Sequence, residues 1–214
     1  MKDIIEKPRP ENTEAAQHIQ HPIAEHPLGQ FLRFIYEIGK TVVVVLVIYT
    51  LVHYLLIQPF QVEGSSMERN FHNDEFLMVQ KISYAIKAPE RGDVIVFKYP
   101  LNPSLNYIKR VIGLPGDKLT ISDGKVIITN TDNPKGLVLN EGYLDAGKVT
   151  SVNGDTAERS WLIENNQYFV MGDNRDHSDD SRSWGTVPKQ NLVGKVWVTV
   201  YPFSDFGLIA HATY

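Results

Sequence analysis

A long segment without charged residues constrains the fold more than any other feature of this chain. Residues 41–57 read TVVVVLVIYTLVHYLLI and contain no Asp, Glu, Lys or Arg. Extended back to Phe34, the segment reaches roughly the 20 residues that a helix needs to cross a bilayer core. The sequence therefore predicts one N-terminal transmembrane helix over residues 34–58, ended by Gln58-Pro59. The alternatives are a helix buried in a soluble core and an uncleaved secretion signal.

The residues on either side of this segment predict its orientation. Residues 1–33 are polar, with prolines, histidines and glutamates in no sustained period, so we expect a flexible tail. Arg33 and Lys40 precede the apolar run, and only Arg69 follows it closely. Because positive residues favour the cytoplasmic side, we expect a cytoplasmic tail and an extracytoplasmic domain over residues 59–214.

Bulk composition excludes several classes of function. The 214 residues are 43% hydrophobic and 21% charged, which is typical of a folded chain rather than a disordered one. A net charge of -4 provides no basic field that would attract nucleic acid. The chain has no cysteine, so disulfides, thiol nucleophiles and cysteine-ligated zinc are excluded.

Short apolar runs separated by glycine and proline predict a mostly β, antiparallel domain after Pro59. Residues 119–121 and 126–128 flank Asp123-Gly124, which is the pattern of a hairpin. Residues 118–165 are expected to form an inserted, hairpin-rich subregion of this domain. Further predicted strands are the runs at 93–97, 168–171 and 196–200.

Three blocks in this domain carry candidate chemistry. They are 62–67 (VEGSSM), 107–117 (YIKRVIGLPGD) and 172–182 (GDNRDHSDDSR). A serine such as Ser66 is a weak nucleophile that needs a base. A lysine such as Lys109 is a base only when burial removes its proton near neutral pH, and its apolar neighbours could provide that burial. From the residues alone, a turn serine and an exposed strand lysine remain open alternatives.

Together with the runs at 91–94 (RGDV) and 201–204 (YPFS), these blocks resemble the boxes of bacterial type I signal peptidases. Those enzymes are membrane-bound Ser–Lys proteases that remove signal peptides. The resemblance covers about residues 34–207 in the family's order, and the block at 172–182 matches nearly letter for letter. It implies a signal-peptidase-like antiparallel β catalytic domain preceded by the transmembrane helix, with no cofactor and no metal.

Residue by residue, the resemblance implies a catalytic pair and a supporting set. Ser66 is expected to attack the scissile carbonyl, and Lys109 is expected to act as general base. Ser178 is expected to orient the lysine amine, unless it is a simple turn serine. Gly64 and the Ser66 amide are expected to serve the oxyanion. The charged residues expected to brace the site are Asp173, Arg110, Asp180 and Arg182.

The family prefers small substrate residues at positions −1 and −3. The residues that match its shallow apolar pockets are Phe60, Val62, Met67, Tyr107 and Ile108, and ordinary core positions are the alternative. The chain departs from the family pattern Ser-Met-x-Pro-Thr-Leu, because Glu68-Arg69-Asn70-Phe71 follows Met67. This departure leaves the loop conformation open. Phe71 is expected to reshape the pocket and, with Phe60, to form an apolar patch at the membrane interface.

Other chemistries fit the sequence less well. The aspartates between 173 and 180 lack the glycine and glutamate of an EF-hand loop and alternate with arginines, so no metal is expected. A Ser-His-Asp triad would require His72 or His177 near Ser66. Self-cleaving repressor proteases use a Ser–Lys pair on a similar fold but carry an N-terminal DNA-binding module. In this chain a polar tail and an apolar segment occupy that region.

The sequence thus predicts a membrane-anchored serine endopeptidase that removes N-terminal signal peptides from translocated preproteins. The alternative is a non-catalytic or specialised membrane-anchored binding paralogue on the same fold. The expected location is the bacterial plasma membrane, with a single pass. The expected partners are secretory preproteins, the lipid bilayer and the translocation machinery, and no nucleic acid.

Overall fold

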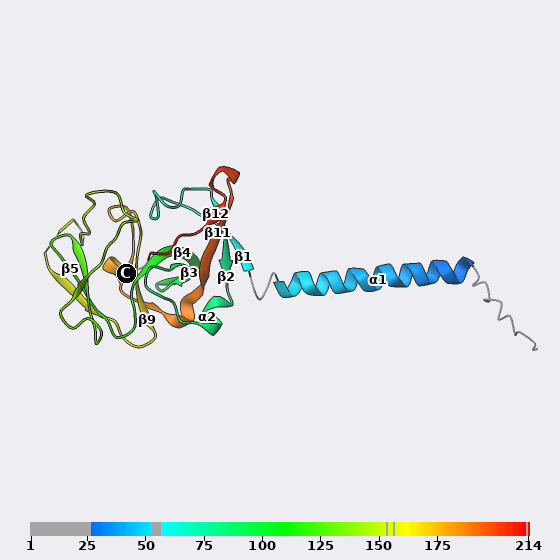
Figure 1. Ribbon diagram of the computed structural model, residues 1–214, viewed down its shortest axis with the longest axis horizontal. Helices are drawn as coiled ribbons and strands as arrows, with labels where there is room; N and C mark the ends of the chain where they lie inside the picture. Colours follow the sequence, from blue (N-terminus) through cyan, green and yellow to red (C-terminus); the bar gives the residue numbers. More distant parts are fainter. Residues whose placement is uncertain (1–26, 53–56, 153, 156, 213) are drawn as a thin grey trace, which may run out of the picture. The chain divides into compact units, whose positions relative to one another are not determined.

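The computed structural model describes residues 27–52, 57–152, 154–155, 157–212 and 214 (Figure 1). Two compact units make up the chain, an N-terminal one that ends at Leu46 and a β-rich one from Val47 to Tyr214. All residues of the candidate site belong to the β-rich unit.

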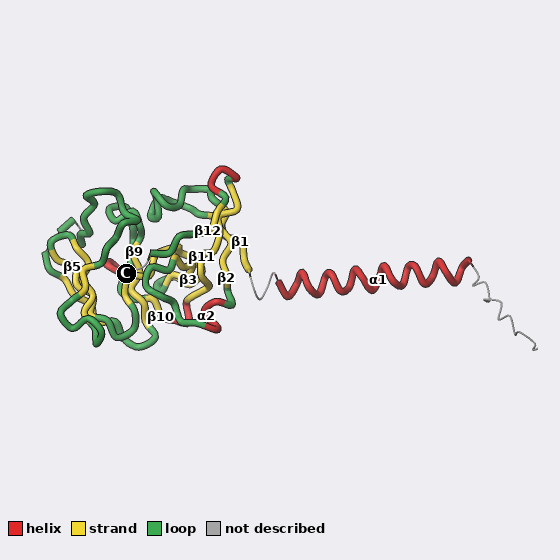
Figure 2. The backbone as a smooth tube through the Cα atoms, in the orientation of Figure 1, coloured by secondary structure: helices red, strands yellow, loops and turns green. Residues whose placement is uncertain are grey.

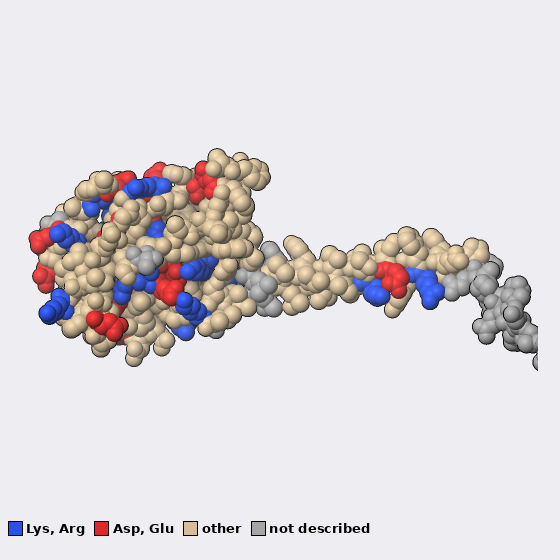
Figure 3. Space-filling model, in the orientation of Figure 1, with Lys and Arg blue, Asp and Glu red and all other residues tan. Residues whose placement is uncertain are grey.

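Helix α1 (Pro27–Leu51) contains most of the described N-terminal residues. It begins at a proline, which suits the first helical position because its missing N–H has no partner there. None of its residues is buried, and its charged side chains gather in its N-terminal part (Figure 3). Among the described residues, no helix combines the length and the apolar character that identify a membrane-crossing helix.

The boundaries of α1 differ from those expected for the segment at 34–58. Residues 27–33, expected in the tail, are helical, because Leu28, Phe31 and Leu32 extend the apolar pattern towards the N-terminus. Residues 1–26 and 53–56 lie outside the described residues. Ile57 and Gln58 belong to a strand rather than to the helix, because their backbone groups pair in an antiparallel ladder.

The larger sheet has the order β1-β2-β11-β3-β4-β9-β10, with β12 paired to β11 (Figure 2). Every pairing in it is antiparallel, which confirms the predicted mostly β, antiparallel domain. Its strands are β1 (Ile57–Gln61), β2 (Phe76–Gln80), β3 (Val94–Tyr99), β4 (Asn102–Gly113), β9 (Gln167–Met171), β10 (Val187–Pro188), β11 (Leu192–Tyr201) and β12 (Gly207–Leu208). Pro59 is tolerated in β1 because that strand lies at the sheet edge.

The smaller sheet has the order β7-β6-β5-β8 and lies within the 118–165 region. Its strands are β5 (Lys118–Ser122), β6 (Lys125–Thr129), β7 (Leu137–Val138) and β8 (Arg159–Leu162). The predicted β5–β6 hairpin is confirmed, since Leu119 pairs with Ile128 across the turn. Asp123 and Gly124 have φ values of 49° and 74°, the left-handed pair that a two-residue hairpin turn requires.

Short helices and a buried cluster complete the β-rich unit. The helices are α2 (Ser83–Ile86), α3 (Ser181–Trp184), η2 (Lys189–Asn191) and η3 (Phe203–Asp205). The loop from β1 to β2 lies on a buried apolar cluster that includes Met67, Phe71, Leu77 and Val96. This cluster supports the loop that carries Ser66.

Candidate active site

The candidate site lies where the β1–β2 loop meets β4. Ser66 is in a turn of that loop, and Lys109 is in β4, where it pairs with Ile95 of β3. Lys109 Nζ donates a hydrogen bond to Ser66 Oγ at 2.6 Å and another to the Ile108 carbonyl oxygen at 3.1 Å. A proton can therefore pass directly between Nζ and Oγ.

Burial changes the acidity of Lys109, which is only 4% exposed. Desolvation disfavours the charged ammonium and lowers the pKa of Lys109 from 10.5 to about 8. The carboxylates of Asp180 and Asp179 act in the opposite direction without cancelling the effect. A lysine with this pKa is partly unprotonated near neutral pH, as a general base must be.

The backbone around Ser66 leaves one donor available. The Ser66 carbonyl oxygen accepts a hydrogen bond from the Asn174 N–H at 3.0 Å, whereas within the described part of the chain the Ser66 N–H donates none. Gly64 has a φ of 89° and donates its N–H to Asn73 Oδ1 at 2.8 Å. The left-handed conformation of Gly64 turns the chain just before Ser66, and the free Ser66 amide can bind a developing oxyanion.

Ser178 lies beside this turn without joining it. A Cβ at Gly172 would lie 2.2 Å from Ser178 Oγ and 2.4 Å from the Ser66 carbonyl oxygen, so only glycine fits between them. Ser178 Oγ is buried and has no hydrogen-bond partner among the described residues, although it lies near enough to Asp180 to help lower the pKa of that carboxyl. The expected hydrogen bond from Ser178 to Lys109 is thus not formed in this structure.

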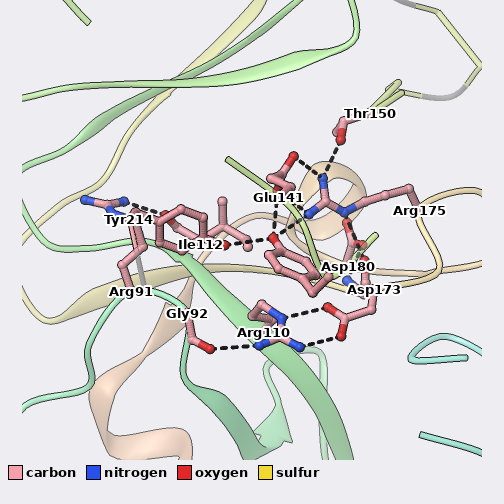
Figure 4. Close-up of polar contacts among 12 residues, drawn as sticks. Arg91, Gly92, Arg110, Ile112, Glu141, Thr150, Asp173, Arg175, Asp180 and Tyr214 are labelled. Atoms are coloured by element: carbon pink, nitrogen blue, oxygen red, sulfur yellow. Dashed lines mark hydrogen bonds and ion pairs between the residues drawn. The ribbon is translucent and has the colours of Figure 1, made fainter. Parts of the chain in front are cut away.

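Arg110, the residue after Lys109, forms a buried ion pair with Asp173 (Figure 4). Arg110 Nε donates to Asp173 Oδ1 at 2.8 Å, and Nη2 donates to Oδ2 at 2.6 Å. Arg110 Nη1 donates to the Gly92 carbonyl oxygen at 2.9 Å, and the Tyr143 ring covers the guanidinium at 4.2 Å. The bidentate geometry fixes β4 against the segment that follows β9.

Asp180 and Arg182 form a second pair. Asp180 accepts from Arg182 Nε and Nη2, both at 2.8 Å, and also from the Gly172 N–H at 3.0 Å. Burial raises the pKa of Asp180, but the Arg182 guanidinium outweighs it, so the pKa lies below its usual range. Arg182 also donates to the carbonyl oxygens of Ser151 and Arg175, which ties the 172–182 loop together.

Arg175 is a part of this network that the sequence analysis did not single out. It is 2% exposed and pairs with Glu141, with a further hydrogen bond to Thr150 (Figure 4). Its Nη2 donates to Tyr143 Oη at 3.0 Å, and its Nε donates to the Gly172 carbonyl oxygen at 3.1 Å. The sequence offered one indication of Arg175: it lies in the block at 172–182, which matches the signal peptidase family most closely.

A groove of about 520 Å³ opens beside Ser66, within the size range of ligand sites. Phe60, Val62, Tyr107 and Ile108, all predicted to contact substrate, line it. Met67 does not line this groove, which corrects the expectation for that residue. It is 1% exposed under the turn, where its Sδ accepts from the Asp173 N–H at 3.4 Å.

The departure from the family pattern gives the turn its own conformation. Arg69 has a φ of 87°, a value that proline cannot adopt. Phe71 is 2% exposed and packs with the cluster under the loop, so it neither reshapes the groove nor forms a surface patch. Phe60 is half-buried and faces the groove.

The histidines and aspartates do not build a competing site among the described residues. His177 lies at the groove, but its closest polar contact is Asn174 Oδ1, 3.4 Å from Nδ1. His72 lines a different hollow. Neither donates to or accepts from Ser66 within the described chain, and no group of three or more acidic or histidine side chains there could hold a metal ion.

Comparison with known proteins gives a consistent result. Residues 35–201 match the family model described as signal peptidase, peptidase S26. Signal peptidase I of Pseudomonas aeruginosa is 34% identical over 205 residues, which cover 76% of this chain and 72% of that protein. Signal peptidase I of Leptolyngbya laminosa is 34% identical over 97% of this chain and 96% of its own length. A solved signal peptidase I from Enterococcus faecalis V583 is 31% identical and aligns with a TM-score of 0.42 over 51% of this chain and 97% of that chain.

Proposed function

The chain belongs to the signal peptidase family, peptidase S26, and is an enzyme of that class; on this premise we propose that Ser66 and Lys109 are its catalytic pair. The reaction is hydrolysis of the peptide bond that joins the signal peptide of a preprotein to its mature part. The observation that supports the pair most is the 2.6 Å hydrogen bond between Lys109 Nζ and Ser66 Oγ. The lowered pKa of Lys109 supports it further.

In this mechanism neutral Lys109 accepts the hydroxyl proton of Ser66 while Oγ forms a bond to the scissile carbonyl carbon. The tetrahedral intermediate carries an oxyanion that the free Ser66 N–H stabilises. The carbon–nitrogen bond then breaks, and the leaving amine takes the proton from Lys109 Nζ. A water molecule attacks the acyl-enzyme, giving its proton to Lys109, and the released Ser66 Oγ recovers that proton.

The remaining residues are proposed to position the catalytic pair. Ser178 is proposed to form a hydrogen bond to the amine of Lys109 during catalysis, because its buried hydroxyl is unpaired among the described residues and lies, like the Ser66 carbonyl oxygen, against Gly172. Arg110 with Asp173, and Arg182 with Asp180, are proposed to brace the turn and the 172–182 loop. Buried pairs of this geometry keep their partners in one place.

Specificity for small residues at positions −1 and −3 is proposed to come from the groove beside Ser66. Phe60, Val62, Tyr107 and Ile108 supply apolar surface to its lining, which also contains the charged residues Glu63, Lys109 and Asp179. The apolar part of this lining favours short apolar substrate side chains such as alanine.

The chain is proposed to be anchored in the bacterial plasma membrane by the apolar segment that was expected over residues 34–58 and that stops before β1 (Ile57–Gln61), with the tail in the cytoplasm and the β domain outside. The uncharged sequence at 41–57 and the positive residues that precede it support this orientation. The lipid bilayer and the translocation machinery are then its proposed neighbours. An alkaline carbonate wash that releases the full chain from membranes would refute the anchor.

Contact of the β domain with lipid is proposed at a different surface from the expected Phe60–Phe71 patch. Trp197, Tyr201, Phe203, Phe206 and Leu208 are exposed on β11, β12 and the turn between them. Aromatic side chains in such a cluster suit a membrane interface.

The test is cleavage of a preprotein with Ala-x-Ala before its cut site, with detergent-solubilised full chain. Wild type is compared with Ser66→Ala and with Lys109→Met, which keeps an unbranched side chain only one atom shorter but cannot accept a proton. Ser204→Ala and Lys118→Met are matched controls, because both residues are exposed and lie in η3 and β5, outside the candidate site.

Cleavage after the second alanine by wild type and both controls, but by neither site variant, is the expected result. Folding of all variants is checked by circular dichroism. Cleavage by Lys109→Met at the wild-type rate would remove lysine from the mechanism. A folded wild type that does not cleave would refute general preprotein processing and favour the specialised, binding alternative.

A further inference from the structure

Two consecutive residues of the segment after β9 hold the turn that carries Ser66. On one side, the Asn174 N–H donates to the Ser66 carbonyl oxygen at 3.0 Å. On the other, Asn70 Nδ2 donates to Asp173 Oδ2 at 2.8 Å. Asn70 closes the same turn, since its N–H donates to the Met67 carbonyl oxygen at 3.2 Å. Asn174 Nδ2 also donates to the Ser65 carbonyl oxygen at 3.0 Å, so Asn174 holds the turn at Ser65 and Ser66, and Asp173 holds it at Asn70.

The Asn70 amide is anchored more firmly than an exposed asparagine usually is. Its Nδ2 also donates to the Tyr143 carbonyl oxygen at 3.1 Å, so both amide donors are used. The acceptor Asp173 is itself held by two hydrogen bonds from Arg110 and cannot follow the turn if the turn moves. A hydrogen bond to an ionised and immobile carboxylate is stronger than one between neutral groups.

The turn has a particular need for such an anchor. Arg69 has a φ of 87°, so the proline that occupies this position in the family pattern could not adopt its conformation. A non-glycine residue in the left-handed region persists only when its surroundings hold it there. Asn70, the residue that follows, reaches the fixed Asp173 carboxylate with its side chain at 2.8 Å, a shorter contact than the 3.4 Å from the Asp173 N–H to Met67 Sδ.

We propose that Asn70 is a positioning residue for Ser66, a role that rests on the proposed Ser–Lys function. By tying the end of the turn to the Asp173–Arg110 pair, Asn70 fixes Ser66 Oγ against Lys109 Nζ and holds the Ser66 N–H at the oxyanion. Asn70 is not among the described residues that line the groove, so it acts on Ser66 and not on bound substrate.

The role predicts an effect on kcat with little effect on KM. A displacement of about 1 Å at a reacting atom costs on the order of 100-fold in rate, so partial loosening of the turn is expected to lower kcat about tenfold. KM is expected to stay within about twofold of wild type, because the substrate contacts in the groove are unchanged.

Asn70→Thr and Asn70→Val test this role as a matched pair, because the two side chains have nearly the same shape and only threonine has a donor for Asp173. Asn70 is exposed, so neither variant disturbs the apolar cluster, and melting curves verify folding. Glu68→Ala is the control, since Glu68 is an exposed residue of the same turn. Asn70→Val is expected to lose about tenfold in kcat, Asn70→Thr to recover most of it, and Glu68→Ala to match wild type.

A second readout separates this inference from the proposed function. A p-nitrophenyl ester acylates Ser66 when Oγ bonds to the acyl carbon, Lys109 takes the hydroxyl proton and p-nitrophenolate leaves. This acylation needs no preprotein. A wild type that reacts with the ester but cleaves no preprotein would therefore refute the proposed function and leave the role of Asn70 testable by acylation. Equal kcat values and equal acylation rates for Asn70→Thr and Asn70→Val would overturn the role of Asn70, as would a loss expressed only in KM.

Discussion

The pH dependence of cleavage tests the link between the burial of Lys109 and its proposed role. Lys109 is 4% exposed, and burial lowers its pKa to about 8. The base must be neutral, so activity should be low in acid, rise with pH and level off above the pKa. At pH 7 about a tenth of Lys109 is then neutral, against roughly one part in 3,000 for an unshifted lysine, a gain of about 300-fold.

The assay is kcat/KM for preprotein cleavage from about pH 5.5 to about pH 10, at constant ionic strength, because this quantity reports the ionisation of the free enzyme. The expected profile gains about tenfold per pH unit in the acid limb and has its midpoint near 8. A charge variant checks the cause. The exposed carboxylate of Asp179 raises the pKa of Lys109, so Asp179→Asn should move the profile to lower pH. Asp132→Asn, an exposed change in the β6–β7 connection, should leave it in place.

Three results would refute this explanation. A midpoint near 10.5 would mean that burial does not shift Lys109. A midpoint near that of histidine, abolished by His177→Gln, would assign the base to an imidazole instead. A shift to higher pH in Asp179→Asn would contradict the electrostatic cause.

Further predictions concern the backbone and the buried charges around the turn. Arg69→Pro should abolish cleavage because proline cannot adopt a φ of 87°, whereas Arg69→Gly should keep kcat within about threefold of wild type, as measured by preprotein cleavage. Gly172→Ala should lower kcat by at least about 100-fold, since its Cβ would lie 2.4 Å from the Ser66 carbonyl oxygen, and wild-type kcat in this variant would show that the contact yields. Arg110→Met should lower the unfolding free energy by about 3–5 kcal/mol in urea denaturation, because it leaves the buried Asp173 carboxylate without its opposite charge; a loss under about 1 kcal/mol would mean that water reaches the carboxylate.

Local patterns in the sequence predicted the strands and the hairpin because the information they use is local. The β5–β6 hairpin follows from Asp123-Gly124, whose backbone conformations depend on those two residues. The helix boundary was less predictable, because Ile57 and Gln58 join β1 only when β2 provides partners. The choice between helix and strand there depends on residues more than 20 positions away.

The sequence by itself determined the family, the antiparallel β class and the candidates Ser66 and Lys109, because each depends on residue types in order along the chain. Only the tertiary structure decided that Nζ and Oγ lie 2.6 Å apart, since the two residues are on separate elements. It also decided that Met67 is buried rather than in the groove, and that Asn70 reaches Asp173. The tertiary structure also decides the pKa of Lys109, because exclusion of water depends on how strands distant in sequence pack around the amine.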